Sequence, residues 1–457
     1  MTRLPHRLPP ALLALALVAC GGDAVDPTVT PAPSAPAPAA SESAEPSPSA
    51  GEVEPPPGSS SRIYAPNPAA IVVAVEAGHG GCLDWGVPDP EERGREFSEK
   101  AITMSIARAL ADRLEADGVT PILIRDGDEA LAGDLYSPLG CEGEPFRDVN
   151  GDELAGFGPD VPEATRTRDE LQARLDRANL AGADVLVSLH VDSITDAAGN
   201  LLPIARTETF YTDETPWGVP AAQRLAEEIQ RALVVAMDAA AGYERQDRGT
   251  NAHNLYIVAP PLVETTPERD DPKRQPTRGA LMPAVLVEVG TITLPAEHEL
   301  LLGDEGAAAA ATGIFDGLAA WFGVRELAGR IALADADPSR APTAVPGDGP
   351  PFVAPPIGEG PLRLRVTNTG TRAWPAGARI VGGWQADAAP YLYLPPDEIA
   401  AIGPELPALE PGASVIVTVV PPEPPAGGGL AWFSLRVGDE TLADHGSPAL
   451  QLSSGAP

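Results

Sequence analysis

Three apolar segments of the sequence are each followed by a side chain that could bind a metal ion or transfer a proton. Residues 71–75 lead through Glu76-Ala-Gly to His79, residues 185–189 lead into His190, and residues 284–287 lead into Glu288. Short apolar runs that alternate with helical stretches are typical of buried parallel strands. Functional sites in open parallel sheets form at the carboxyl ends of the strands. We therefore expect the two histidines and the glutamate to meet at one edge of a sheet.

Glu99 could bring a third metal ligand to the same edge, because it begins a helical stretch at residues 99–117. His, Glu and His with one open position form a catalytic zinc set, and zinc lowers the pKa of a bound water to about 7. The glycines around His79 would allow a sharp turn toward such a site. The alternatives are that the histidines are ordinary core or surface residues, and that Glu99 is a first-turn acid stabilised by the helix dipole.

The surrounding pattern alternates between strands and helices. Strands are expected at residues 71–75, 121–124, 184–189, 207–211, 255–258 and 284–289, and helices at residues 99–117, 171–181, 220–241 and 305–322. This alternation predicts an α/β fold with a mostly parallel twisted sheet and flanking helices. We assign residues 68–324 to this domain.

The composition excludes one class of partner. The formal charge is −34, with 65 acidic against 31 basic residues, and Lys100 and Lys273 are the only lysines. The sequence contains no basic stripe, so nucleic acid is not an expected partner. The acidic balance concerns solubility rather than fold.

The N-terminus resembles a bacterial lipoprotein signal. A basic start precedes an apolar run, residues 11–18, that is too short to span a bilayer. The run ends Leu-Val-Ala-Cys20-Gly, which resembles the lipobox, in which cleavage precedes an acylated cysteine. We expect residues 1–20 to be signal peptide and lipobox, and residues 21–67 to be a disordered Pro/Ala/Ser tether. Cys20 would then anchor the exported protein to a membrane of the cell envelope, in the periplasm or at the outer surface. An ordinary signal peptide with an incidental cysteine is the alternative.

Two further cysteines, Cys82 and Cys141, would also lie in an oxidising compartment after export. They could form a disulfide or remain two free thiols. Their spacing does not decide between these alternatives.

The C-terminal third has a different pattern. A Pro- and Ala-rich segment, residues 325–356, is expected to be a linker. Short alternating strands follow at residues 362–366, 414–420 and 430–437, separated by turns such as Asn-Thr-Gly and Glu-Pro-Gly. Residues 357–455 are therefore expected to form an all-β sandwich.

An ordered set of motifs resembles one family of enzymes. The set comprises Gly78-His79-Gly80-Gly81, Glu99-Lys100, Arg125 with Asp128, Arg174 with Ala178-Asn179, Ala183-Asp184, Ser188-Leu189-His190-Val191-Asp192, Arg248-Gly249 and residues 282–290. In order and spacing it is similar to the zinc-dependent N-acetylmuramoyl-L-alanine amidases of the amidase 3 type. The resemblance covers residues 71–322. It implies that zinc is bound by His79, Glu99 and His190, and that Glu288 is the catalytic carboxylate.

The resemblance also implies peptidoglycan as the substrate, cleaved at the amide between N-acetylmuramic acid and L-alanine of the stem peptide. Arg248 and His253 are candidate substrate contacts, and a loop residue without a role is an equally good interpretation of His253. The sequence departs from the family pattern at Glu76-Ala77, where the family has Asp-Pro. It also departs after Gly290, where Thr-Ile-Thr-Leu replaces Phe-x-Ser-Asn.

Part of the C-terminal domain resembles the Ig-like domain named after the protein next to BRCA1. The resemblance rests on Asn368-Thr-Gly, on Trp374-Pro, and on the turn at Pro411-Gly412 before another strand. Trp374, Trp384 and Trp432 are expected in its core rather than on a carbohydrate-binding surface. A wall or protein partner for this domain stays a hypothesis.

Two other functions stay open at this point. One is a related zinc carboxypeptidase-like peptidase that cleaves a different peptide bond. The other is a non-catalytic cell-envelope binding protein, which would have neither zinc nor turnover. The presence of all four proposed chemical residues favours the amidase.

Overall fold

The computed structural model describes residues 67–81, 84–133, 147–150, 163–214, 221–259, 278–336, 341–346, 349–358, 360–386, 399–421 and 423–454. The expected signal peptide, almost all of the expected tether, and the cysteines Cys20, Cys82 and Cys141 lie outside these residues. Among the helices in these ranges, none combines the length and apolar character that a transmembrane segment needs.

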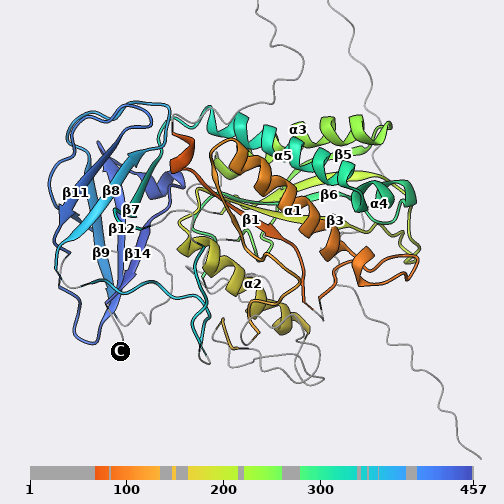
Figure 1. Cartoon of the computed structure of the whole chain (residues 1–457), viewed down its shortest axis with the longest axis horizontal. Helices are drawn as coiled ribbons and strands as arrows, with labels where there is room; N and C mark the ends of the chain where they lie inside the picture. Colours follow the sequence, from red (N-terminus) through yellow and green to blue (C-terminus); the bar gives the residue numbers. More distant parts are fainter. Residues whose placement is uncertain are drawn as a thin grey trace, which may run out of the picture.

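A six-stranded sheet forms the centre of the first domain, counting only described residues (Figure 1). Its strands are β1 (Val72–Ala77), β2 (Thr120–Leu123), β3 (Val185–Asp192), β4 (Arg206–Tyr211), β5 (Gln246–Ala252) and β6 (Ala284–Thr291), in the spatial order β2-β1-β3-β6-β4-β5. The first four in that order are parallel, β4 is antiparallel to β6, and β5 is parallel to β4. The expected mostly parallel α/β fold is confirmed.

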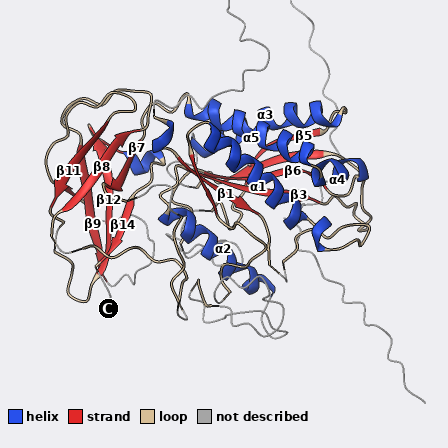
Figure 2. Ribbon diagram, viewed as in Figure 1, coloured by secondary structure: helices blue, strands red, loops and turns tan. Residues whose placement is uncertain are grey.

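Helices cover both faces of this sheet (Figures 1 and 2). The helices are α1 (Glu99–Ala116), α2 (Glu163–Leu180), α3 (Gln223–Ala241), α4 (Pro295–Leu302) and α5 (Asp304–Phe322). Helices α1, α5 and α3 lie side by side over one face, and α2 lies on the other. The apolar period of α1 sets its orientation, because Ile102, Ile106 and Leu110 are all buried against the sheet.

Successive residues of the central strands face these two layers in turn, as a strand requires. Val73 and Val75 pack in the core with α1, α3 and α5, whereas Val72 and Ala74 pack in the core with α2. The same alternation holds in β3 until its second half, where Ser188 and His190 replace apolar residues on the α2 side. In β3, polar side chains therefore enter the sheet on the α2 face.

The expected strand at residues 255–258 is wrong. These residues form a turn, and the edge strand β5 lies earlier in the chain. Tyr256, Ile257 and Val258 are buried in the core on the α2 side, so their apolar character reflects a buried turn. Strand β5 itself is mostly exposed and polar, so its sequence lacks the alternation of apolar and polar residues that predicts a strand.

Two antiparallel sheets form the second domain, within the described residues. One contains β7 (Gly329–Leu333), β8 (Leu362–Asn368) and β11 (Ser414–Val419), and the other contains β9 (Arg379–Ala386), β10 (Ala400–Ile402), β12 (Gly429–Val437), β13 (Glu440–Thr441) and β14 (Leu450–Ser453). Trp374 and Trp432 are 1% and 2% exposed, so the expected core positions of these two tryptophans are confirmed.

Part of the expected linker is structured. Strand β7 lies within residues 325–356 and pairs with β8, from Gly329 opposite Asn368 to Leu333 opposite Leu364. Phe352, later in the same segment, is 1% exposed and packs in the first domain on the α2 side. The chain therefore passes from α5 to the second domain, back to the first, and again to the second.

A buried ionic contact joins the domains at the start of β3. Asp184 is fully buried and accepts hydrogen bonds from the backbone N–H of Val72 (3.0 Å), from Nη1 of Arg325 (3.2 Å) and from Nη1 of Arg330 (3.4 Å). Because Asp184 immediately precedes β3, this contact lies at the opposite end of the strand from His190.

Candidate metal centre

His79 lies in a tight turn directly after β1. Its φ of 61° is in the left-handed region, which among the described non-glycine residues it shares only with Glu92. A Cβ on Gly78 would lie 2.5 Å from Cε1 of His190 and 2.6 Å from the carbonyl oxygen of Leu189. Only glycine therefore lets the turn cross the end of β3 so closely. The Gly-His-Gly-Gly segment places His79 against His190, as its composition indicated.

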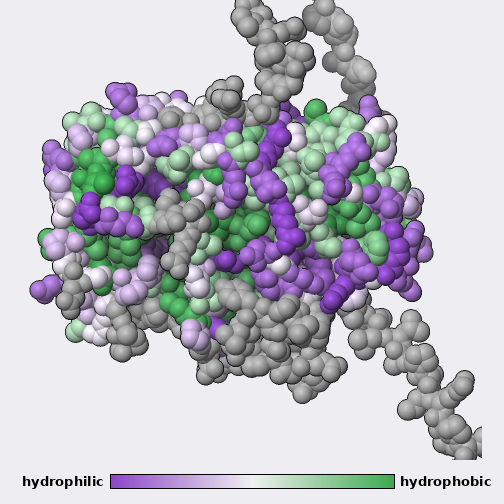
Figure 3. Space-filling view, viewed as in Figure 1, coloured by the Kyte–Doolittle hydropathy of each residue, from purple (hydrophilic) through white to green (hydrophobic). Residues whose placement is uncertain are grey.

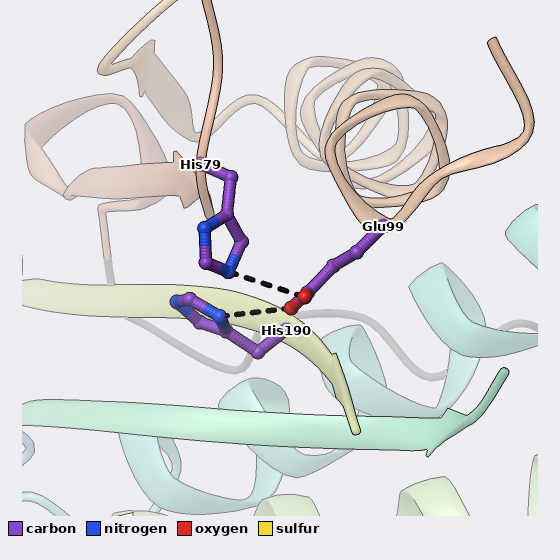
Figure 4. Close-up of side chains that lie close together, drawn as sticks. All are labelled: His79, Glu99 and His190. Atoms are coloured by element: carbon purple, nitrogen blue, oxygen red, sulfur yellow. Dashed lines mark hydrogen bonds and ion pairs between the residues drawn. The ribbon is translucent and has the colours of Figure 1, made fainter. Parts of the chain in front are cut away.

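Three side chains from three elements converge at this point (Figure 4). Nε2 of His79 lies 3.2 Å from Oε2 of Glu99, and Nδ1 of His190 lies 3.0 Å from Oε1 of Glu99. One potential ligand atom from each residue lies within 4.8 Å of the other two. The structure thus brings together the three residues that the sequence predicted as a ligand set, from the turn after β1, the start of α1 and the second half of β3.

Opposite charges hold this cluster together. Burial would raise the pKa of Glu99, but the two histidines outweigh this effect and lower it. Burial would lower the pKa of His79, but Asp84 and Glu99 outweigh it and raise that pKa well above its usual value. The carboxylates of Glu99 and Asp84 therefore favour a positive charge in the cluster, which a bound cation would supply.

Glu288 lies beside this cluster. Strands β3 and β6 pair with His190 opposite Glu288. Glu288 is 5% exposed, and its Oε2 has no hydrogen-bond partner among the described residues. Burial, followed by the negative charges of Asp192 and Glu99, raises the pKa of Glu288 well above its usual value. A carboxyl group with a raised pKa is suited to accepting and returning a proton near neutral pH.

Glu76, where the sequence departs from the family pattern, is a buried support beneath the site. It lies in register with Ser188 on β3, and it accepts hydrogen bonds from the Ser188 hydroxyl and from Nη1 of Arg174. Burial opposes its ionisation, but Arg174, His190 and Ser188 together outweigh burial and lower the pKa of Glu76. The longer glutamate therefore has a partner for each carboxylate oxygen.

The sequence did not single out two residues that complete the surroundings of His79. Asp84 accepts a hydrogen bond of 2.7 Å from Nδ1 of His79, which leaves Nε2 facing Glu99. Gly86 has a φ of 66°, and a Cβ there would lie 2.5 Å from Cδ2 of His79 and overlap the Glu99 carboxylate. The available signal was an acid and a glycine within seven positions of His79.

The two candidate substrate contacts lie at opposite ends of β5. Arg248 is near the start of β5, and its charge acts on Glu208, which pairs in register with Glu288. His253 follows the end of β5 and lies against Phe210, with ring centroids 6.2 Å apart. Strand β5 runs in the opposite direction to β6, so the end of β5 that precedes His253 lies at the edge of the sheet where β6 begins. Only Arg248 therefore lies at the Glu288 edge.

The donor set fits zinc. Two imidazole nitrogens and one carboxylate oxygen are ligands that zinc accepts, and three protein ligands are typical of its catalytic sites. The hydrogen bond from His79 to Asp84 is the kind of outer contact that orients a metal-binding histidine. The unpaired Oε2 of Glu288 adds a buried acceptor beside the cluster.

Comparison with known proteins decides the family. A family model described as N-acetylmuramoyl-L-alanine amidase matches residues 73–320, more than half of the chain. The chain belongs to the N-acetylmuramoyl-L-alanine amidase family. The matched residues of this amidase run from β1 into α5 and include His79, Glu99, His190 and Glu288.

Relatives of the amidase each match about half of the chain. The protein YqiI of Bacillus subtilis is 23% identical over 251 residues, which cover 55% of this chain and 84% of YqiI. The N-acetylmuramoyl-L-alanine amidase LytC of Bacillus subtilis is 24% identical over 250 residues, which cover 55% of this chain and 35% of LytC. Among solved structures, the N-acetylmuramoyl-L-alanine amidase AmiC2 of Nostoc punctiforme is 21% identical, with a TM-score of 0.35 over 55% of this chain and 95% of that chain.

Family membership gives the activity and the compartment. The protein is a peptidoglycan hydrolase that uses zinc, and it acts on the cell wall outside the cytoplasm. Its His-Glu-His cluster is suited to the metal that this activity requires.

Proposed function

We propose that His79, Glu99 and His190 are the zinc ligands of the amidase and that Glu288 is its catalytic carboxylate. The observation that most supports this assignment is the convergence of three ligand atoms within 4.8 Å, with Glu288 in register beside His190. Zinc, when bound, would activate water and polarise the carbonyl group of the scissile amide.

Glu288 carries the proton between the two halves of the reaction. The attacking water must lose a proton, and the amino group of L-alanine must gain one in order to leave. Glu288 accepts the first proton at its unpaired Oε2 and donates it to the amine nitrogen as the C–N bond breaks. Its raised pKa, caused first by burial, stabilises the protonated state between these steps. The products are a free lactyl carboxyl group and a free amine.

Substitution of the two kinds of residue separates metal binding from proton transfer. Glu288→Gln should retain stoichiometric zinc and lose about 100-fold or more of the rate on purified sacculi, as expected for a lost general base. His190→Ala should lose zinc. His445→Ala, which replaces an exposed histidine of the second domain, is the matched control and should change neither property. A near-normal rate for Glu288→Gln would refute the role of the carboxylate.

The products distinguish the amidase from the carboxypeptidase-like alternative. Digestion of sacculi should release whole stem peptides with free L-alanine amino groups, and a chelator should abolish the release. Release of a single terminal amino acid would instead indicate the peptidase.

We also propose that Arg248 contacts the substrate. It lies at the Glu288 edge of the sheet, and its charge acts on Glu208 beside Glu288. Arg248→Ala should raise KM for soluble wall fragments and leave zinc content unchanged. An unchanged KM would exclude the contact.

A lipid anchor at Cys20 and a tether over residues 21–67 would place the amidase at a membrane of the envelope and let it reach the wall above. The lipobox-like sequence before Cys20 supports this proposal. Cys20→Ser should abolish metabolic labelling by a palmitate analogue and release the protein from membranes. Unchanged labelling would refute acylation at this residue.

The second domain is proposed to be an Ig-like module that binds the wall or a protein partner. Its two antiparallel sheets around the buried Trp374 support the sandwich assignment. Ile416 and Val420 are 43% and 73% exposed on and beside β11, so they are suitable probes of a binding surface. Ile416→Asp with Val420→Asp, in the Glu288→Gln background, should weaken binding to sacculi if the wall is the ligand, and equal binding would exclude this surface.

A further inference from the structure

The turn that carries His79 is held by two buried arginines from elements outside β1. Arg174 lies in α2 and Arg125 follows β2, and each is 1% exposed. Arg174 donates to the carbonyl oxygens of Ala77 (3.0 Å) and His79 (2.6 Å). Arg125 donates to the carbonyl oxygens of Ala77 (2.8 Å) and Gly78 (3.0 Å). Three successive carbonyl groups of the turn therefore each accept a guanidinium N–H.

These contacts act on the least favourable backbone in the site. A non-glycine residue with positive φ, such as His79 at 61°, costs free energy and persists only where its surroundings impose it. Since the carbonyl of His79 itself accepts from Arg174, rotation of this peptide away from the left-handed region would break that hydrogen bond. The imidazole would then move away from Glu99.

The arginines are themselves rigidly placed. Arg174 forms ion pairs with Glu76 and, at 2.8 Å, with Glu170 one turn earlier in α2. Arg125 also donates to the carbonyl oxygens of Gly127 (2.8 Å) and Lys100 (3.0 Å). A planar guanidinium with several fixed donors can hold several acceptors at once, which a lysine ammonium on a flexible stem cannot reproduce.

We propose that Arg174 and Arg125 are positioning residues for the metal centre, because they impose the left-handed conformation that directs Nε2 of His79 toward Glu99. The inference rests on the proposed role of His79 as a zinc ligand. Neither arginine touches a ligand atom of the cluster in the contacts described above, so both act through the backbone of the turn.

The test uses Arg174→Lys and Arg125→Lys in the full chain, because these variants keep the buried charge and lose the fixed fork of donors. Zinc affinity is measured by competition with a chromophoric chelator, and the geometry of the site by the visible absorption spectrum of the Co²⁺-substituted protein. Each variant should bind zinc about 10–100-fold more weakly, as loss of an outer contact does. The cobalt spectrum should also change. The two arginines lie in different elements, so if one variant does not fold, the zinc affinity and cobalt spectrum of the other still test the inference.

Arg278→Lys is the matched control. Arg278 is 4% exposed and pairs at 2.7 Å with Asp176, also in α2, so its replacement disturbs the same helix. It should lower stability and leave zinc affinity and the cobalt spectrum as in the wild type. Wild-type affinity and spectrum in the folded arginine variants would overturn the inference, as would an equal loss of affinity in Arg278→Lys. Failure of the wild type to bind zinc would instead overturn the ligand assignment of His79, and the inference with it.

Discussion

Replacing Asp184 by asparagine tests the buried contact between the domains. The substitution preserves the shape of the side chain and leaves an oxygen that can still accept from the N–H of Val72, but it removes the charge that faces two guanidinium groups. Burial lowers the pKa of Arg325 and of Arg330, and the charge of Asp184 opposes this effect in both. The variant would leave two buried cations without a counter-ion.

The expected loss in the free energy of unfolding follows from this arrangement. Removing one partner of a buried ion pair typically costs about 3–5 kcal/mol. Arg330 keeps a hydrogen bond of 2.7 Å to the carbonyl of Gly182, and Arg325 keeps one of 3.0 Å to the carbonyl of Gly446. These remaining acceptors place the expected loss near the lower end, at about 3 kcal/mol.

Urea unfolding followed by tryptophan fluorescence measures this loss, because Trp321 reports on the first domain and Trp374 on the second. Asp335→Asn is the control, since Asp335 pairs with Arg363 at 3.0 Å but is 75% exposed in its side chain. Exposed pairs contribute about 0–1 kcal/mol. A loss for Asp184→Asn no greater than that for Asp335→Asn would refute the reasoning.

Three further predictions concern separate parts of the molecule. Gly86→Ala should weaken zinc binding at least about tenfold in a chelator competition, because its Cβ would overlap ligand side chains. Gly199→Ala, with a φ of 81° and no atom within 4 Å of the added Cβ, should leave zinc affinity unchanged. Trp374→Ala should cost about 3–5 kcal/mol in urea unfolding with zinc affinity intact, because this side chain is fully enclosed. Finally, Asp89 lies 3.7 Å from Nδ1 of His298 in α4, and the surface at the α4 end of the molecule is largely hydrophilic in this view (Figure 3). Hydrogen bonds from Arg93 hold the pKa of Asp89 at about 2, below its ordinary 3.8. This stabilisation is complete above pH 3.8 and is lost as the pH falls toward 2, so the stability difference between wild type and Asp89→Asn should shrink over that window, and a constant difference would contradict the assignment.

The ligand cluster could be predicted because its members stand where local patterns end. His190 and Glu288 each follow an apolar run inside β3 and β6, and Glu99 begins α1, so the apolar patterns located them. The parallel order of β1, β3 and β6 then placed two of these strand ends together. The mostly parallel sheet was predictable for the same reason, since its central strands are buried on both faces.

Other features depend on contacts between distant residues, which no local pattern carries. Asp84 is only five residues from His79, but the local sequence does not specify that the turn after β1 orients the two side chains toward each other. The sequence places Arg174 and Arg125 in the family motifs but does not reveal their contacts with the turn, because these contacts follow from tertiary packing. Strand β7 lacks sufficient apolar alternation within a Pro- and Ala-rich segment, and only its pairing with β8 defines it.

The contact at Asp184 also fixes where the second domain lies relative to the metal centre. It joins the second domain to the amino end of β3, and six residues farther along the same strand, roughly 20 Å at the usual rise per residue, lies His190. The chain crosses between the domains more than once through β7 and Phe352, so this placement is built into the connectivity. If the second domain binds a ligand, the metal centre would therefore lie on the side of the first domain away from the second domain. The length of β3 would set the distance between the domain contact at Asp184 and the metal centre at His190.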